Sequence, residues 1–159
     1  MRTLYIGIPI CLVLAFVVAS RLRWPGSEGD VPPVVAQQKA KWTAAQPPQY
    51  ILTVNHSSVS GPSWFTLSKV KAGKLENVLC RRIETSGSIT ECAVSSSLFP
   101  ITVEQVFASV EGAYRGKVQG IEVQYDARYG FPSAVHVDPV AERKGDEWSY
   151  EVEFSAVKE

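Results

Sequence analysis

Residues 101–114 read ITVEQVFASVEGAY and predict an amphipathic helix between two sets of strands, an order that indicates the fold class. Thr102 and Gln105 have the spacing of a capping box, in which each side chain satisfies the other residue's backbone N–H. Ile101 and Val106 fit the hydrophobic contact that accompanies such a box. One stripe of the helix is apolar at three- and four-residue intervals: Val103, Val106, Phe107, Val110 and Tyr114. We therefore predict a helix that starts at Thr102 and packs one face on a core.

On both sides of this helix, apolar and polar residues alternate, as they do in strands that bury one face. The alternating runs are residues 49–56, 63–71, 75–83, 121–126, 135–138 and 148–154. Ala72 and Gly73 separate the second run from the third, which predicts a tight hairpin turn. A first helix is predicted at residues 34–46 because paired prolines stand before and after it. The Ser/Thr-rich residues 84–99 are predicted to form a loop.

The resulting order, α-β-β-β-α-β-β-β, predicts the α+β class. Clean alternation along the strands means that one side of the sheet is dry and the other is wet. The economical arrangement packs both helices on the dry face of a six-stranded antiparallel sheet. We expect residues 34–159 to form this single domain, which matches the usual length of one.

The N-terminal residues 1–20 are predicted to be a transmembrane anchor, because residues 3–20 carry no charge and are mostly apolar. A membrane-spanning helix needs about 20 such residues, and an uncharged stretch of about 18 already qualifies. One alternative is a secretory signal cleaved after Val17-x-Ala19, although Arg21 and Arg23 follow at once and resist export. A buried helix is the other alternative. Residues 21–33, which are rich in proline and glycine, are predicted to be a linker.

The cysteines indicate the compartment of the domain, because the charges that flank the apolar segment leave its orientation open. Cys11 lies inside that segment and lacks the preceding small residues of a lipid-attachment site, so Cys80 and Cys92 remain for the soluble part. Paired cysteines in exported domains usually form a bridge. We predict a Cys80–Cys92 disulfide and a domain on the periplasmic or extracytoplasmic side, or secreted if the segment is cleaved. Two separate buried thiols are the alternative.

The overall charge gives no reason to expect a nucleic-acid partner, because sixteen basic and sixteen acidic residues cancel. The distribution is uneven: residues 34–117 hold nine Lys or Arg against five Asp or Glu, and residues 118–159 hold four against nine. Such an asymmetry can orient a charged partner, although charge runs are mostly solvated surface.

Catalytic and metal-binding motifs are absent from the sequence. No Gly-x-Ser-x-Gly elbow, His-Glu-x-x-His helix, Cys-x-x-Cys pair or phosphate-binding glycine loop occurs. His136 and Asp138 stand two apart on a predicted strand, so both side chains point to the wet face, where such a pair can act as a base or bind a metal. A solvated pair is the simpler interpretation, and the same holds for His56. We expect no cofactor, no metal and no enzymatic activity.

The turn at residues 125–132 has the most individual sequence. Gly130 can adopt a positive φ, Pro132 restricts the entry to the next strand, and Asp126 can accept hydrogen bonds from turn amides. Tyr129 and Phe131 are large rings whose joint exposure would be costly, so they either cap the core or form a contact patch for a partner. We favour capping and keep the turn as a candidate contact site.

These features resemble a known family. The residues that carry the resemblance are, in order, Trp42, Tyr50, Gly73, the helix start Thr102-x-x-x-x-Phe107, the turn at residues 125–132, and Asp138. The sequence from Ala40 to Phe154 is similar to an uncharacterised bacterial family of exported or lipid-anchored proteins, domain of unknown function 6174. The resemblance implies an envelope location and an α+β fold, and it names no reaction. This chain departs from the lipid-anchored members because it lacks their attachment cysteine.

Together these observations predict a membrane-anchored bacterial envelope protein that works by binding. The expected partner is another envelope protein, contacted through the open sheet face or through the turn, and the membrane is contacted through residues 3–20. The alternatives are a hydrolase that uses His136 and Asp138, and a carrier of lipid or another small ligand.

Overall fold

The computed structural model describes residues 30–93, 99–116, 118–140 and 143–157. The elements in chain order are α1 (Pro33–Ala45), β1 (Gln49–Ser58), β2 (Ser63–Lys71), β3 (Lys74–Ile83), β4 (Ile89–Glu91), α2 (Val103–Arg115), β5 (Gly120–Tyr125), β6 (Pro132–Asp138) and β7 (Trp148–Ala156). Among the described residues, no helix is long and apolar enough to cross a bilayer. The predicted anchor, residues 1–20, lies outside the described residues.

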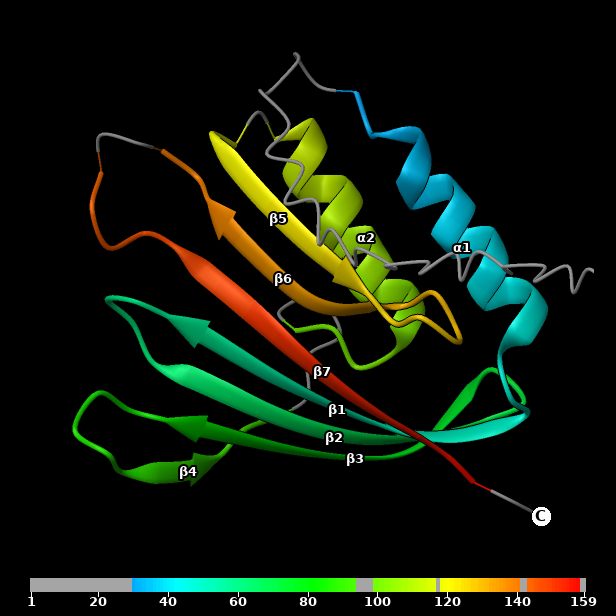
Figure 1. The fold of residues 1–159 in the computed structure, drawn as a ribbon. Helices are drawn as coiled ribbons and strands as arrows, with labels where there is room; N and C mark the ends of the chain where they lie inside the picture. Colours follow the sequence, from blue (N-terminus) through cyan, green and yellow to red (C-terminus); the bar gives the residue numbers. More distant parts are fainter. Residues whose placement is uncertain (1–29, 94–98, 117, 141–142, 158–159) are drawn as a thin grey trace, which may run out of the picture.

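The strands form one antiparallel sheet in the order β4-β3-β2-β1-β7-β6-β5. The first long strand, β1, is therefore the middle strand, and the last strand, β7, returns to pair with it (Figure 1). The register runs from Tyr50 opposite Ala156 to Ser58 opposite Trp148. This pairing joins the half of the chain before α2 to the half after it.

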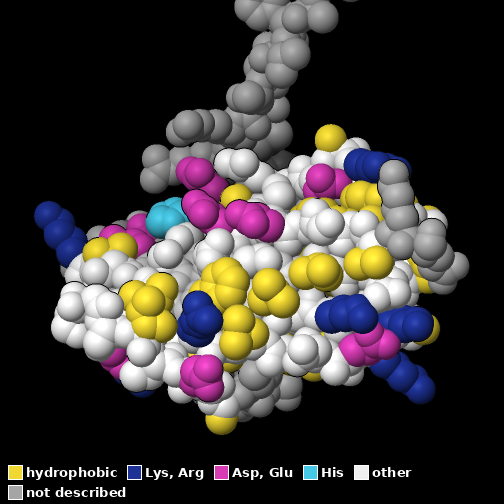
Figure 2. Space-filling view, turned by 90° about the horizontal axis from the view of Figure 1, so that it is seen from below, with side chains coloured by type: hydrophobic (Ala, Val, Ile, Leu, Met, Phe, Trp, Pro, Cys, Tyr) yellow, Lys and Arg dark blue, Asp and Glu magenta, His cyan; other side chains and the backbone are white. Residues whose placement is uncertain are grey.

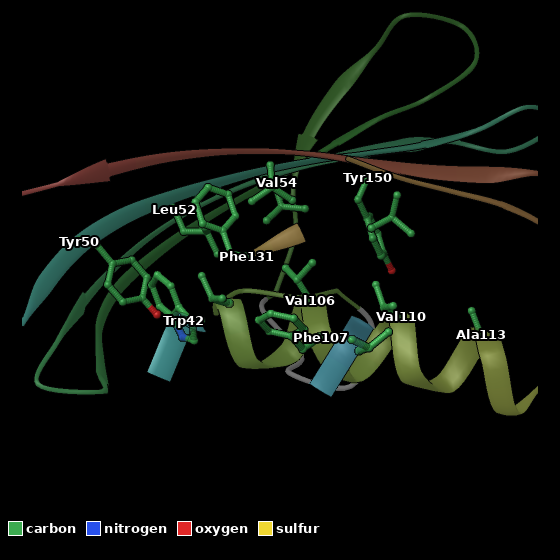
Figure 3. Close-up of a cluster of buried hydrophobic side chains, with 14 of the residues drawn as sticks. Trp42, Tyr50, Leu52, Val54, Val106, Phe107, Val110, Ala113, Phe131 and Tyr150 are labelled. Atoms are coloured by element: carbon green, nitrogen blue, oxygen red, sulfur yellow. The ribbon is translucent and has the colours of Figure 1, made fainter. Parts of the chain in front are cut away.

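Both helices lie on the same face of the sheet, as predicted (Figure 1). The side chains between the two layers come from alternate strand positions and from the apolar stripe of α2 (Figure 3). Fully buried members include Trp42 of α1, Leu52 of β1 and Phe107 of α2. The α+β class and the packing of both helices against one sheet face are thus confirmed.

Helix α2 begins where the sequence predicts, with a small change in its cap. The Thr102 hydroxyl accepts a hydrogen bond from the backbone N–H of Gln105 at 3.3 Å. The Gln105 side chain accepts from the backbone N–H of Ile101 at 2.7 Å, one residue before the expected donor. Two backbone donors are still satisfied at this end, which is what a cap has to achieve.

The prediction of six strands was wrong by one. Residues Ile89–Glu91, inside the predicted loop 84–99, form β4 and pair with β3. A tight turn precedes this short strand, with Gly87 at φ 84°. Three residues are too few to show alternation, and all three are exposed. Their strand conformation comes from the neighbouring β3, which no local pattern reveals.

Candidate functional site

The face of the sheet that points away from the helices carries an apolar band. Tyr50, Leu52 and Val54 of β1 point into the core, so the alternate residues of this strand point outward. The outward apolar side chains on the first three strands are Ile51, Phe65, Leu67, Leu79 and Ile83. Leu67 lies directly opposite Leu79 and is 37% exposed. Figure 2 shows hydrophobic side chains running across the middle of this view. In the described part of the chain, no helix covers this open face.

The cationic side of the open face lies over β2 and β3. Its Lys and Arg side chains share the outward positions of these two strands with the apolar band: Lys69, Lys71, Lys74 and Arg81. Lys69 forms an ion pair with Glu76, with Nζ and Oε2 3.0 Å apart. Arg81 lies opposite Phe65 on one flank and Glu91 on the other. Positive charge therefore predominates on this side of the sheet.

The anionic side lies over β5, β6 and β7, and these three strands contain no Lys or Arg. Their four carboxylates occupy outward positions: Glu122, Asp138, Glu151 and Glu153. Among the described residues, none of the four forms an ion pair, and no group of three metal-ligating side chains gathers there. The sheet order thus turns the uneven charge along the sequence into two sides of one surface.

His136 lies on the anionic side, where it is exposed and pairs with Glu122 on β5 and Ser149 on β7. It lines a shallow depression of about 180 Å³ with Ser57, Ser58, Val59, Glu147, Trp148 and Ser149. Asp138 does not line this depression, and it pairs with Gly120 at the end of β6. Within the described ranges, no hydrogen bond joins His136 to Asp138 or to a serine hydroxyl. The arrangement therefore lacks the nucleophile–base–orienter chain that covalent hydrolysis needs.

His56 lies on the opposite face from His136, inside an aromatic group that the sequence did not predict. Four rings surround the imidazole, with centroids 5.0–6.2 Å away: Trp64, Phe99, Trp148 and Tyr150. The Nδ1 atom of His56 is buried and has no hydrogen-bond partner among the described residues. Burial lowers the pKa of His56 because the charged form loses solvation. We call these five residues the His56 cluster.

The turn between β5 and β6 packs against α1. The Asp126 carboxylate accepts hydrogen bonds from the backbone N–H groups of Arg128 at 2.9 Å and Tyr129 at 2.6 Å. Gly130 adopts φ 82°, and a Cβ placed there would lie 2.9 Å from the backbone oxygen of Gln38 on α1. The side chain of Lys41 on α1 also donates to the backbone oxygen of Ala127 at 2.6 Å. This loop therefore forms the surface on which α1 packs.

The side chains of this turn point mainly inward. Phe131 is 3% exposed and packs edge-on against Trp42, with ring centroids 6.1 Å apart, and Pro132 is fully buried. Tyr129 is half-buried against the same indole at 6.5 Å. The favoured prediction, that the two rings cap the core, is confirmed for Phe131. A contact role for the turn stays a prediction, and only the exposed edge of Tyr129 and its neighbour Arg128 remain to serve it.

The predicted disulfide between Cys80 and Cys92 is present. The two Cα atoms are 5.2 Å apart, and the backbone N–H of Cys92 donates to the oxygen of Cys80 at 3.2 Å. Cys80 lies on β3, and Cys92 directly follows β4. The bridge therefore fastens the short edge strand to the sheet, and closing a loop of this size stabilises a fold by about 2–3 kcal/mol.

Comparison with known proteins agrees with the resemblance seen in the sequence. No curated protein matches this chain. A family described as "Family of unknown function (DUF6174)" matches residues 34–156, a span that includes all seven strands. Because the match covers most of the chain, this protein belongs to the DUF6174 family of unknown function.

Proposed function

We propose that this chain is a membrane-anchored domain of the bacterial envelope that binds a protein partner and does not catalyse a reaction. The observation that carries the proposal is the open face of the sheet. It combines an exposed apolar band with two sides of opposite charge, and no described helix covers it. Interfaces that recognise a protein use this combination of apolar contact and complementary charge.

The Cys80–Cys92 disulfide supports the location, because such bridges persist in oxidising compartments. The test is a pair of reporters fused after Glu159, one active only outside the cytoplasm and the other only inside. We expect activity from the first alone, together with cysteines that resist alkylation until the bridge is reduced. Activity from the second reporter and two freely alkylated thiols would contradict the location.

The binding surface can be tested with a photo-crosslinking amino acid in the full-length chain in its native cells. Thr53 points outward on β1 at the centre of the open face. Gln37 is exposed on α1, on the other side of the molecule, and is the matched control. We expect a defined protein adduct from Thr53 and none from Gln37. Adducts from Gln37 alone, or from neither position, would remove the open face from consideration.

The hydrolase alternative has one observation in its favour, because His136 shares a depression with Ser57 and Ser149. A serine-reactive fluorophosphonate probe tests it directly. Our proposal expects no labelling of either serine. Labelling at Ser57 or Ser149 that disappears in His136→Ala would favour the enzyme.

The carrier alternative needs a roomy apolar cavity between the helices and the sheet. Trp42, Leu52 and Phe107 belong to the buried cluster that packs in this layer (Figure 3).

A further inference from the structure

We infer that the partner of the open face is a second copy of this chain, packed face to face in a two-fold dimer. The inference rests on the proposed function, since it names the protein that the open face binds. It follows from the distribution of charge across the sheet.

The middle strand divides the open face into two halves of opposite sign. β1 contains no Lys, Arg, Asp or Glu, so its outward residues, among them Ile51 and Thr53, are uncharged. Sheet order places the cationic side, β2 and β3, on one flank of β1. It places the anionic side, which begins with Glu151 and Glu153 on β7, on the other flank.

A two-fold interface requires a patch that is complementary to itself. The axis lies in the plane between the two sheets, perpendicular to the line that runs from the cationic to the anionic side. Rotation about it brings Lys71 and Arg81 of each copy to the side where Glu151 and Glu153 of the other copy lie. The uncharged centre of one copy, which includes Ile51 and Thr53, then covers the uncharged centre of its partner.

Other occupants satisfy only part of this surface. A basic protein fits the carboxylates of β5–β7 and offers no opposite charge to Lys71, Lys74 and Arg81 on β2 and β3. An anionic lipid surface fits those lysines and repels Glu151 and Glu153. A second copy complements both halves at once, and it covers Leu67, which is 37% exposed. The observed charges therefore favour self-association over either of these partners.

The experiment uses two differently tagged full-length chains expressed together, each with the photo-crosslinker at Thr53. We expect an adduct that contains both tags. The double reversal Glu151→Lys/Glu153→Lys in both copies places like charges together, and such contacts oppose association. The adduct should fall about tenfold or more, which corresponds to about 1.4 kcal/mol. The opposite reversal, Lys71→Glu/Arg81→Glu, should have the same effect.

Mixing the two reversed chains provides the decisive measurement, because each then offers the charge that the other needs. We expect the adduct between the Glu151→Lys/Glu153→Lys chain and the Lys71→Glu/Arg81→Glu chain to return to the wild-type level. The charge-conserving variants Glu151→Asp/Glu153→Asp and Lys71→Arg/Arg81→Lys are the matched controls and should keep the adduct throughout. If the adduct that contains both tags persists in both reversed variants, or if the mixed chains form no such adduct, the partner of the open face is not a second copy.

The outcomes also separate this inference from the proposed function. An adduct at Thr53 with a different protein, together with no adduct that contains both tags, would rule out the dimer and leave the open face as a binding surface. No adduct at Thr53 of any kind would count against both.

Discussion

The two ends of the helix-covered sheet face each gather aromatic rings, but they differ in whether a helix supplies one of the rings and in whether the central polar atom is hydrogen-bonded. At one end, Trp42 of α1 is 1% exposed and packs edge-on against Tyr50, Phe131 and Phe154 at 5.4–6.1 Å. We call these four residues the Trp42 cluster. Its indole N–H donates to the Glu104 carboxylate of α2 at 2.9 Å. At the other end, the His56 cluster takes no ring from α1, and Phe99, from the connection before α2, lies against Trp64 at 4.6 Å.

The difference shows which rings hold the fold together. Both clusters use strands β1 and β7, so the sheet alone does not distinguish them. In the Trp42 cluster a helix supplies the central ring, and the polar atom of that ring is hydrogen-bonded. In the His56 cluster the buried Nδ1 has no described partner. Burying such an atom without a hydrogen bond costs about 1–3 kcal/mol. The Trp42 cluster is the stabilising end, and the His56 cluster is the weaker end.

The largest expected effect is the loss of the central indole. Trp42→Ala should lower the free energy of unfolding by about 3–5 kcal/mol, because a fully buried ring leaves a cavity and its packing is lost. The loss for Trp64→Ala in the His56 cluster should be smaller than the loss for Trp42→Ala by about 1 kcal/mol or more, because Trp64 is only half-buried. Urea unfolding of the full-length chain, followed by circular dichroism, measures both. Equal losses at the two positions would mean that the clusters are equivalent.

The features that could be predicted from the sequence are those that depend on residues close together along the chain. Helix α2 and its cap were predictable because an apolar stripe and a capping residue are local features. The turn at residues 125–132 was predictable for the same reason, since Asp126 bonds to amides two and three residues away. Strand β4 was missed because its three residues take their conformation from β3.

The His56 cluster was missed because its rings are scattered along the chain and meet only through the sheet order. Trp64, His56 and Tyr150 lie side by side on β2, β1 and β7, yet the last of them is far from the other two in sequence. No periodicity reveals that β7 returns to pair with β1. The same is true of the open face: the uneven charge was visible along the chain, but its separation into two sides depends on that pairing.

The next effect concerns the turn at residues 125–132, on which α1 packs beside the Trp42 cluster. Gly130→Ala should destabilise the fold by about 2 kcal/mol or more. A side chain at its positive φ is strained, and the added Cβ would meet Gln38 at 2.9 Å. Gly73→Ala is the matched control, because Gly73 has φ 72° but no atom within 4 Å of the added Cβ. It should cost about 1 kcal/mol. Thermal unfolding compares the two variants. Equal destabilisation would mean that α1 moves to accommodate the added Cβ at no cost in stability.

A smaller effect is expected from the acceptor of the indole N–H. Glu104→Ala should lower the free energy of unfolding by about 1 kcal/mol, because the Trp42 donor loses its partner. Glu104→Gln keeps an acceptor oxygen at the same position and should cost less. The order of the two variants in urea midpoint is the readout. A Glu104→Gln loss as large as that of Glu104→Ala would show that charge, and not the hydrogen bond, matters there.

The smallest effect appears only on acidification and belongs to the His56 cluster. Burial lowers the pKa of His56 below its usual 6.5, so the unfolded chain binds a proton more readily than the folded one. Stability is therefore complete above pH 6.5 and falls as the pH drops from there toward the folded-state pKa. Urea midpoints between pH 7.5 and 5.5 should decline in the wild type and decline less in His56→Phe, which cannot be protonated. His136→Gln, on the exposed open face, is the control and should keep the wild-type decline. If His56→Phe loses stability as steeply as the wild type over this range, the His56 imidazole is not the acid-sensitive group, and the contrast between the two clusters reduces to the ring that α1 supplies.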